Sequence, residues 1–501
     1  MADIHILPQV SAFLAQDHGQ FIDGQYQPTA NAERLPVVNP ANGRTITDVA
    51  SASADDVDRA LESAGRALQG DWGRCLPAQR QQILLRLADL LEAHREEFAQ
   101  LEALTNGKLI GDARRFEVDH TCVFIRYYAG WATKLHGETL APSIPSFAGE
   151  QYTAMTYREP VGVVAAIVPW NFPVMIAIWK VAAALCTGCC IVLKPSEFAP
   201  LTLLRLAELA HQAGVPAGVF NVVNGGRQVG QWLIEHPRVN KVSFTGSVPA
   251  GIAIGQAALK ADLTRVTLEL GGKNPAAFLA DVDAERAVDG IMLAGLVHQG
   301  QVCSSAERFY VHASRFDEIV ERVIARVETL RIGSPLDETT QYGPLANQPH
   351  FARMQALFER ARQGGQVLSG GQALVGDGFY VTPTVIRANG HDDPLMREEA
   401  FAGVLSFMPF EDEEQLLQWM NDSAYGLSAS LWTNDFSKAL RLMRRIEAGM
   451  VWINSHTIMD PAVPFGGWKA SGIGREFGSA FIESYTELKS VIMCYWGPCA
   501  P

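Results

Sequence analysis

Hydrophobic positions in the first third of the chain recur at helical spacing. Between about 55 and 135, apolar residues such as Ile83, Leu87 and Leu90 alternate with charged ones, which is the period of amphipathic helices. From residue 161 the pattern changes to short apolar runs separated by helical stretches, and this alternation predicts a parallel sheet with helices on both faces. The predicted strands are 161–168, 190–193, 219–223, 241–244 and 267–270.

A second block of the same texture runs from about 271 to 470. Its apolar segments 309–311 and 451–454 are predicted strands, and 316–330 is a predicted helix. We therefore expect an α/β fold with two doubly wound, Rossmann-like domains. Near the C-terminus, residues 485–493 alternate in the strand pattern, and an exposed strand edge would seek a partner.

Length, charge and termini narrow the class of protein. A chain of 501 residues exceeds the size of one hydrophobic core. Its net charge of −13 and the lack of Lys/Arg runs argue against nucleic-acid binding. The first residues carry no basic region followed by an apolar stretch, so we expect a cytoplasmic protein. The most apolar stretch, 176–193, contains Lys180, which favours a buried helix and strand over a membrane span.

The cysteines indicate neither disulfides nor a metal site. Without an export signal we expect the thiols to stay reduced. Cys186 and Cys189 match C-x-x-C, but their surroundings are apolar and no second pair or His is nearby, so we interpret them as buried core residues and expect no metal. The eight cysteines are at positions 75, 122, 186, 189, 190, 303, 494 and 499.

A glycine turn at 244–251 is suited to binding a pyrophosphate. It follows an apolar strand and precedes a helical stretch, where free N–H groups and the helix dipole favour an anion. Its spacing resembles a P-loop, but Ile252 and Ala253 replace the Lys-Ser/Thr pair, which excludes an ATP site. A second glycine cluster, 472–478, has one residue too many for a dinucleotide fingerprint and is interpreted as a backbone turn.

Three other segments could carry chemistry. Glu197, in the turn after a predicted strand, would accept from a ribose 2′-hydroxyl and repel a 2′-phosphate, favouring NAD over NADP. Asn171, in a stiff aromatic turn, suits an oxyanion hole, although it could simply cap the turn. Glu269 lies in an apolar strand, where burial would raise its pKa toward that of a general base.

Cys303 has small, polar neighbours, unlike the apolar ones around Cys189. A thiol there could be ionised by a helix N-terminus and attack a carbonyl. No neighbouring base is visible in the sequence. Cys303 is therefore a candidate nucleophile whose local surroundings alone do not decide its role.

Taken together, seven segments resemble the aldehyde dehydrogenase superfamily. They occur in the order typical of that superfamily and extend over nearly the whole chain. They are Pro169-Trp-Asn-Phe-Pro173, Lys194-Pro-Ser-Glu197, Phe244-Thr-Gly-Ser247, Glu269-Leu-Gly-Gly-Lys-Asn-Pro275, Gly300-Gln-Val-Cys303, Glu398-Glu-Ala-Phe401 and Pro464-Phe-Gly-Gly-Trp-Lys469.

This resemblance implies NAD-dependent oxidation of an aldehyde to a carboxylic acid through a cysteine thiohemiacetal and a thioester. Cys303 would be the nucleophile and Glu269 the base that activates the hydrolytic water. Asn171 and the backbone N–H of Cys303 would form the oxyanion hole. Lys180 would lie near Glu269 and assist its proton transfer.

The resemblance also implies the cofactor site. Lys194 and Glu197 would bind the adenosine ribose, Ser247 the pyrophosphate and Glu399 the nicotinamide ribose. One departure affects Glu399: where the family usually has Glu-Ile-Phe-Gly-Pro-Val, residues 399–404 are Glu-Ala-Phe-Ala-Gly-Val, and the missing Pro would loosen this turn. The implied cofactor-binding residues are Ile167, Pro169, Trp170, Lys194, Ser196, Glu197, Gly226, Gly230, Phe244, Gly246, Ser247, Leu270, Glu399 and Phe401.

The domain organisation follows from the same resemblance. It implies an NAD-binding domain at 1–138 and 159–270 and a catalytic domain at 271–470. A small β extension for oligomerisation is implied at 139–158 and 484–501. We therefore expect a homo-oligomer, either a dimer or a tetramer.

Within the superfamily, the chain most resembles the phenylacetaldehyde dehydrogenases. The resemblance includes segments 18–24, 116–118, 126–127 and 453–460. The absence of Arg from 455–465 disfavours a dicarboxylic semialdehyde, which would need a cation. The implied substrate-binding residues are apolar and mostly aromatic, which suits a phenyl ring; they are Phe172, Met175, Trp179 and Phe465.

Three alternatives remain open. A cationic aminoaldehyde of the betaine-aldehyde type could use aromatic walls and Asp460 as its counter-charge, although a carboxylate before Pro461 more often starts a turn. A coenzyme A-acylating enzyme would share Cys303, but Glu269 favours hydrolysis. A non-catalytic relative would also share the fold.

Overall fold

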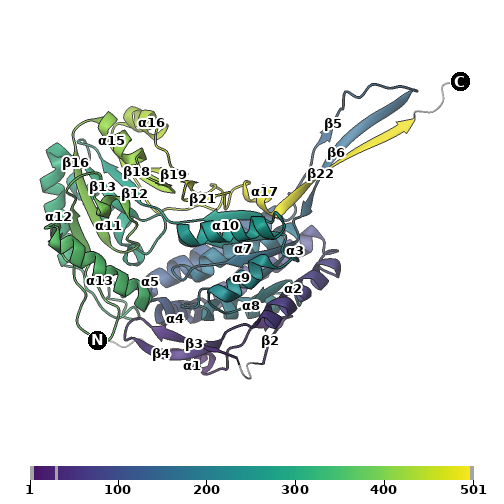
Figure 1. The fold of residues 1–501 in the computed structure, drawn as a ribbon, viewed down its shortest axis with the longest axis horizontal. Coiled ribbons are helices and arrows are strands. Elements are labelled where there is room, and N and C mark those ends of the chain that lie inside the picture. Colours follow the sequence, from purple (N-terminus) through teal and green to yellow (C-terminus); the bar gives the residue numbers. More distant parts are fainter. Residues whose placement is uncertain (1–4, 29–31, 497–501) are drawn as a thin grey trace.

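The computed structural model describes residues 5–28 and 32–496. It comprises two large sheets with their helices, and a β arm that projects from the body (Figure 1). This arrangement confirms the predicted α/β class with two doubly wound sheets. No helix in the described part of the chain is long and apolar enough to cross a membrane.

The first sheet is built mainly from parallel strands that are buried on both faces. Strand order reverses between β7 and β10, because β8 and β9 extend on one side and β10 and β11 on the other. Ligands of doubly wound sheets bind at such a point, beyond the carboxyl ends of the strands. In spatial order the strands are β2 (Gln25–Tyr26), β1 (Phe21–Ile22), β9 (Phe220–Val222), β8 (Cys190–Lys194), β7 (Val163–Ile167), β10 (Lys241–Thr245), β11 (Arg265–Glu269) and β21 (Gly472–Ile473).

Helices cover both faces of this sheet, which explains the continuous apolar runs of its strands. One layer contains α2 (Ala54–Gln69), α9 (Arg227–Glu235) and α10 (Val248–Asp262). The other contains α7 (Pro173–Thr187) and α8 (Leu201–Gln212). Against these pack α3 (Pro77–Ala93), α4 (Arg95–Asn106), α5 (Ile110–Asp112), a π-helix (Ala113–His120) and α6 (Thr121–Trp131).

The second sheet is also mainly parallel and has a hydrophobic core on each face. Ala276 and Phe278 face one core and Ala277 and Leu279 the other, as expected for a strand buried on both sides. The strands, in spatial order, are β14 (Val367–Ser369), β15 (Thr384–Arg387), β16 (Val404–Phe410), β13 (Ala306–His312), β12 (Asn274–Phe278), β18 (Ser428–Trp432) and β19 (Met450–Ile453). Its helices are α11 (Ala284–Leu296), α12 (Phe316–Glu328), α13 (Gln348–Gln363), α14 (Pro394–Arg397), α15 (Glu413–Asn421) and α16 (Phe436–Met443).

The arm is an antiparallel sheet in which β6 (Glu150–Pro160) pairs with β22 (Thr486–Trp496) along its whole length, and β5 (Thr139–Leu140) adds a short edge. Of the segment expected at 484–501, residues 497–501 lie outside the described residues. The remaining elements are α1 (Pro8–Leu14), β3 (Arg34–Asn39), β4 (Arg44–Ala50), β17 (Tyr425–Gly426), β20 (Trp468–Lys469), α17 (Phe481–Tyr485) and 3₁₀ turns at Val297–Gly300 and Ala313–Arg315.

Two sequence predictions need correction in detail. The amphipathic stretch 55–135 is not uniformly α-helical, because Ala113–His120 forms a π-helix. The glycine cluster at 472–478 is not only a turn, since Gly472–Ile473 pairs as an edge strand with β11. Seven cysteines are free in the described part of the chain, and Cys499 lies outside it. The described residues contain no His/Cys/Asp/Glu cluster suited to a metal ion.

Candidate active site

A cleft opens at the carboxyl edge of the first sheet, where its strand order reverses. It encloses about 1510 Å³ including its open mouth. Ser247 is the N-cap of α10 but makes no capping hydrogen bond with its side chain, so its hydroxyl and the helix N-terminus are available to an anion. Seven of the expected cofactor-binding residues line this cleft: Ile167, Lys194, Glu197, Gly226, Gly230, Phe244 and Ser247.

Lys194 has a fixed position in the wall of this cleft. Its Nζ donates to the carbonyls of Pro195 at 2.9 Å and Gly225 at 2.5 Å. Burial lowers the pKa of Lys194, and the nearby Glu197 carboxylate acts in the opposite direction. The two residues therefore lie close enough to act on the same ribose.

The other expected cofactor residues lie outside the lining of this cleft. Trp170 packs edge-on against Phe401, with ring centroids 5.5 Å apart. Glu399 accepts a 2.8 Å hydrogen bond from the N–H of Gly272, and burial raises the pKa of its carboxyl to about 7. Pro169, Ser196, Gly246 and Leu270 lie at the ends of strands of the same sheet or just beyond them.

The backbone that leads to Cys303 is strained. His298, Gln299 and Gly300 have consecutive positive φ angles of 48°, 57° and 75°, which is costly for the two that are not glycine. A Cβ on Gly300 would collide with the carbonyl of Ala402 and lie 2.6 Å from the nitrogen of Gly403. The loop that leads to Cys303 therefore packs directly on Ala402 and Gly403.

Cys303 lies in a turn between this 3₁₀ segment and β13, not at the start of a helix. The expectation that a helix N-terminus ionises its thiol is therefore wrong. Burial, followed by the charges of Glu269 and Glu399, raises the pKa of the thiol to about 12. The cysteine is a neutral thiol at pH 7 and needs a base to become a nucleophile.

Glu269 ends β11 and is 4% exposed, and neither carboxyl oxygen has a hydrogen-bond partner. As expected, burial raises the pKa of its carboxyl well above the ordinary value. Glu476 adds to this rise, whereas Lys180 and Arg475 oppose it. Lys180 lies near Glu269 but forms its ion pair with Glu476 at 2.8 Å. An unpaired buried carboxyl beside the thiol has the properties of a general base.

Asn171 points its amide toward the loop that leads to Cys303. Its Nδ2 donates to the carbonyl of Gln301 at 2.8 Å, two residues before Cys303. Its own carbonyl accepts a 2.7 Å hydrogen bond from Lys108 Nζ, which fixes the peptide. The placement suits an amide donor that turns to an oxyanion when substrate binds.

A second, smaller pocket has Cys303 and Asn171 in its wall and encloses about 460 Å³ including its open mouth. Phe172, Met175 and Trp179 line it as expected. Phe465 does not: it is 1% exposed and stacks on Phe477 beside Trp179. The sequence did not identify the other lining residues, which are Phe116, His120, Ile176, Val297, Val302, Thr457 and Met459.

Some of these missed lining residues lie in segments that the sequence analysis had already singled out. Phe116 and the loop at 453–460 belong to segments that carry the family resemblance. His120 lies four residues beyond Phe116, and both project into the cavity from the π-helix, an element that is frequent at functional sites. A π-helix has no recognisable signature in a single sequence, so His120 could not be identified.

The sequence model described as "Aldehyde dehydrogenase family" matches residues 26–491. The chain belongs to this family. The phenylacetaldehyde dehydrogenase of Pseudomonas fluorescens is 45% identical to this aldehyde dehydrogenase over 98% of each chain. An NAD⁺ complex of an aldehyde dehydrogenase from Bacillus cereus superposes with a TM-score of 0.94 at 38% identity, covering 98% of this chain and 99% of that one.

A betaine aldehyde dehydrogenase from Staphylococcus aureus in complex with NAD⁺ is also similar. It has a TM-score of 0.93 and 35% identity, with 97% of this chain and 96% of that chain covered. The protein is therefore an NAD-dependent aldehyde oxidoreductase that acts on small-molecule aldehydes. Membership of the family leaves open which aldehyde it oxidises.

Proposed function

We propose that this enzyme oxidises an aromatic aldehyde of the phenylacetaldehyde type to its carboxylic acid. The observation that carries the proposal is the cavity at Cys303: its aromatic walls include Phe116, Phe172 and Trp179, and its described lining residues include no Asp, Glu, Lys or Arg. A phenyl ring is bound by such apolar walls, with one polar end at the reacting carbon. The 45% identical phenylacetaldehyde dehydrogenase supports the same choice.

Two contacts argue against a cationic substrate. Asp460 is not part of the cavity wall, and its Oδ1 accepts the N–H of Ala462 at 2.8 Å, as a residue that starts a turn does. One face of Phe172 already carries a cation, since Lys108 Nζ lies 3.8 Å from the ring centroid. The similar betaine aldehyde dehydrogenase keeps the aminoaldehyde as the alternative to test.

The residues of the first cleft fit NAD. The free hydroxyl of Ser247 and the N-terminus of α10 suit the pyrophosphate, and the Lys194–Glu197 turn suits the adenosine ribose. Glu399 would accept from the nicotinamide ribose. This assignment makes 1–138 and 159–270 the cofactor domain and 271–470 the catalytic domain.

In the proposed mechanism, Glu269 accepts the proton of the Cys303 thiol, and the thiolate attacks the aldehyde carbon. Asn171 Nδ2 and the N–H of Cys303 stabilise the oxyanion of the thiohemiacetal. The chemistry that NAD supplies when bound is to accept a hydride, so that the thiohemiacetal becomes a thioester on Cys303. Glu269 then passes this proton to the carboxylate of Glu476, the partner of Lys180. It next takes a proton from water, whose hydroxide attacks the thioester carbon and displaces the Cys303 thiolate, and Glu269 returns the proton to that thiolate to restore the thiol.

The β arm is the proposed site of assembly into a homo-oligomer. Its exposed apolar side chains would be covered by a second copy. Light scattering of the wild type and of an Ile492→Lys variant tests the assembly, and we expect a smaller particle for the variant. We also propose that the enzyme works in the cytoplasm, where its cysteines stay reduced. The exposed apolar residues include Leu140, Tyr157, Leu488, Ile492 and Trp496.

The substrate assignment is tested by comparing kcat/KM for phenylacetaldehyde, hexanal and betaine aldehyde with NADH absorbance as the readout. We expect phenylacetaldehyde to exceed betaine aldehyde by at least about tenfold, equivalent to roughly 1.4 kcal/mol. A tenfold preference for betaine aldehyde would contradict the proposal. Formation of acid without coenzyme A excludes the acylating alternative, and any turnover excludes a non-catalytic relative.

A further inference from the structure

The loop that carries Glu399 is fixed by a carboxylate that the proposed mechanism does not use. Glu307, on β13, accepts the N–H of Ala400 at Oε2 over 2.8 Å and the N–H of Phe401 at Oε1 over 2.7 Å. Phe401 has a φ of 56°, a strained conformation for a bulky residue. Both oxygens of one side chain therefore stabilise the turn that directly follows Glu399.

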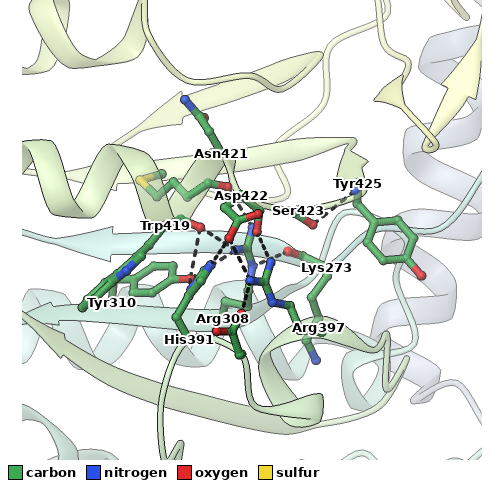
Figure 2. A network of polar contacts seen from close by, with 12 residues as sticks. Lys273, Arg308, Tyr310, His391, Arg397, Trp419, Asn421, Asp422, Ser423 and Tyr425 are labelled. Carbon is green, nitrogen blue, oxygen red and sulfur yellow. Dashed lines mark hydrogen bonds and ion pairs between the residues drawn. The ribbon is translucent and has the colours of Figure 1, made fainter.

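Glu307 is itself fixed by a second buried charge. It is 3% exposed and pairs at 2.5 Å with Lys273 Nζ, which is 1% exposed. Arg308 Nε donates to the carbonyl of Lys273 at 2.7 Å, and the same guanidinium binds the carbonyls of Trp419 and Met420 (Figure 2). A buried pair with this support has little freedom, so the position of the Glu307 carboxylate is well defined.

The opposite side of the loop is bound through its carbonyls. Arg353, on α13, donates to the carbonyl of Glu399 at 2.9 Å and to that of Ala400 at 2.6 Å. His350 donates to the carbonyl of Phe401 at 2.8 Å. Arg353 and His350 therefore bind the carbonyls of this loop, and Glu307 binds its N–H groups. These contacts restrain the turn in which the Gly-Pro of the family is replaced by Ala-Gly.

We propose that Glu307 is a positioning residue for the cofactor: by binding the N–H groups of Ala400 and Phe401, it fixes the Glu399 carboxyl at the nicotinamide end of the site. The inference rests on the proposed role of Glu399. The Lys273–Glu307 pair would then contribute to cofactor affinity as well as to stability. Glu307 would act through the backbone of Ala400 and Phe401 and not by contact with the cofactor.

Because Glu307 is charged, replacing it should change the pH dependence of NAD binding, an effect that a purely structural role would not produce. The ionisable groups around Glu399 are Glu307 from β13, Arg353 from α13, Lys273 after β11, Cys303 in its turn and Tyr425 in β17. After burial, Glu307 is the largest cause that raises the pKa of Glu399. A neutral residue at 307 would leave Lys273 unpaired, and both changes would lower the pKa of Glu399.

The test compares Glu307→Gln with Glu97→Gln, which breaks another buried ion pair, the 2.6 Å contact between Glu97 on α4 and Arg205 on α8, in which the glutamate is 4% exposed. Amide hydrogen exchange of a peptide covering 399–403 is measured without cofactor, and the Kd for NAD is measured without aldehyde between pH 6 and 9. In Glu307→Gln we expect exchange at least about tenfold faster and a Kd about tenfold higher, equivalent to about 1.4 kcal/mol. NAD affinity should rise with pH as Glu399 ionises, and the midpoint should shift to lower pH in this variant.

In Glu97→Gln the exchange of this peptide, the Kd and the midpoint should match the wild type. Wild-type exchange and wild-type Kd in Glu307→Gln would overturn the inference, and so would equal changes in Glu97→Gln. The Glu399→Gln variant distinguishes a failure of the proposed role of Glu399 from a failure of the inference about Glu307. If it binds NAD as tightly as the wild type, the proposed role of Glu399 is wrong; if it binds weakly while Glu307→Gln does not, only the inference about Glu307 is wrong.

Discussion

Replacing Glu399 by Gln is expected to stabilise the cofactor-free enzyme above pH 7 while weakening NAD binding. Burial and, after it, the charge of Glu307 raise the pKa of the carboxyl from 4.5 to about 7 in the folded state, whereas the N–H of Gly272, Arg353 and Lys273 oppose the rise. A raised pKa means that the carboxyl carries no penalty below pH 4.5, and that the penalty grows as the pH rises to about 7. The amide oxygen of Gln retains an acceptor for the N–H of Gly272, which Glu399 binds in the wild type.

The magnitude follows from the rise of the pKa from 4.5 to about 7. At 1.36 kcal/mol per pKa unit, the penalty above pH 7 is at most about 3 kcal/mol, and less where solvent screens the partly exposed Glu399. For 501 residues the entropy of unfolding is about 1 kcal/mol/K, so the variant should melt up to about 3 °C higher at pH 8. At pH 5 the difference should be below about 1 °C.

The assay is thermal unfolding of the cofactor-free wild type and variant from pH 5 to pH 8. Glu398→Gln is the matched control, because Glu398 is the neighbouring carboxyl and is 59% exposed. Its Tm difference from the wild type should stay near zero at every pH. A Glu399→Gln difference that does not change with pH, or a lower Tm at pH 8, would refute the account of a carboxyl destabilised by burial.

Three further predictions concern the base, the loop that leads to Cys303 and the substrate wall. Glu269→Gln should lose the fast first burst of NADH, seen by stopped flow, and turn over about 10² to 10⁴ times more slowly, because thiol deprotonation and hydrolysis both lose their base; a burst at the wild-type rate or an unchanged steady-state rate would contradict this role. Gly300→Ala should lower the Tm more than Gly365→Ala, since both glycines have positive φ but only Gly300 abuts Ala402; equal losses would show that strain alone matters. Phe172→Ala should lower kcat/KM for phenylacetaldehyde by about 10- to 150-fold, from the roughly 1.5–3 kcal/mol of lost burial, and affect acetaldehyde much less.

The central strands of the first sheet were predictable because parallel strands buried on both faces produce continuous apolar runs, whereas in the second sheet the sequence analysis named only 309–311 and 451–454. Residues 190–193 and 241–244 were predicted in this way, and β8 and β10 extend only one residue further. Edge strands such as Gly472–Ile473 are short and partly exposed, so they leave no such run. The π-helix at Ala113–His120 differs from an α-helix by its hydrogen bonding, which apolar spacing does not reveal.

Site properties were predictable where a single segment determines them: the apolar strand around Glu269 indicated its burial and raised pKa. The protonation state of the Cys303 thiol could not be predicted, because its raised pKa depends in part on Glu269 and Glu399, residues 34 and 96 positions away. The Lys273–Glu307 pair has the same cause: β12 and β13 pair in parallel and bring the two charges together. Such contacts are set by sheet register, which a single sequence does not contain.

The central claim is that Cys303 carries the substrate through a covalent thioester. Its most direct test is NADH formation by Cys303→Ala with phenylacetaldehyde and saturating NAD, beside a measurement of NAD binding. The account predicts no NADH above the uncatalysed rate and a Kd for NAD within about twofold of the wild type, because the thiol lies outside the lining of the cofactor cleft. Retained turnover in this variant would contradict the mechanism.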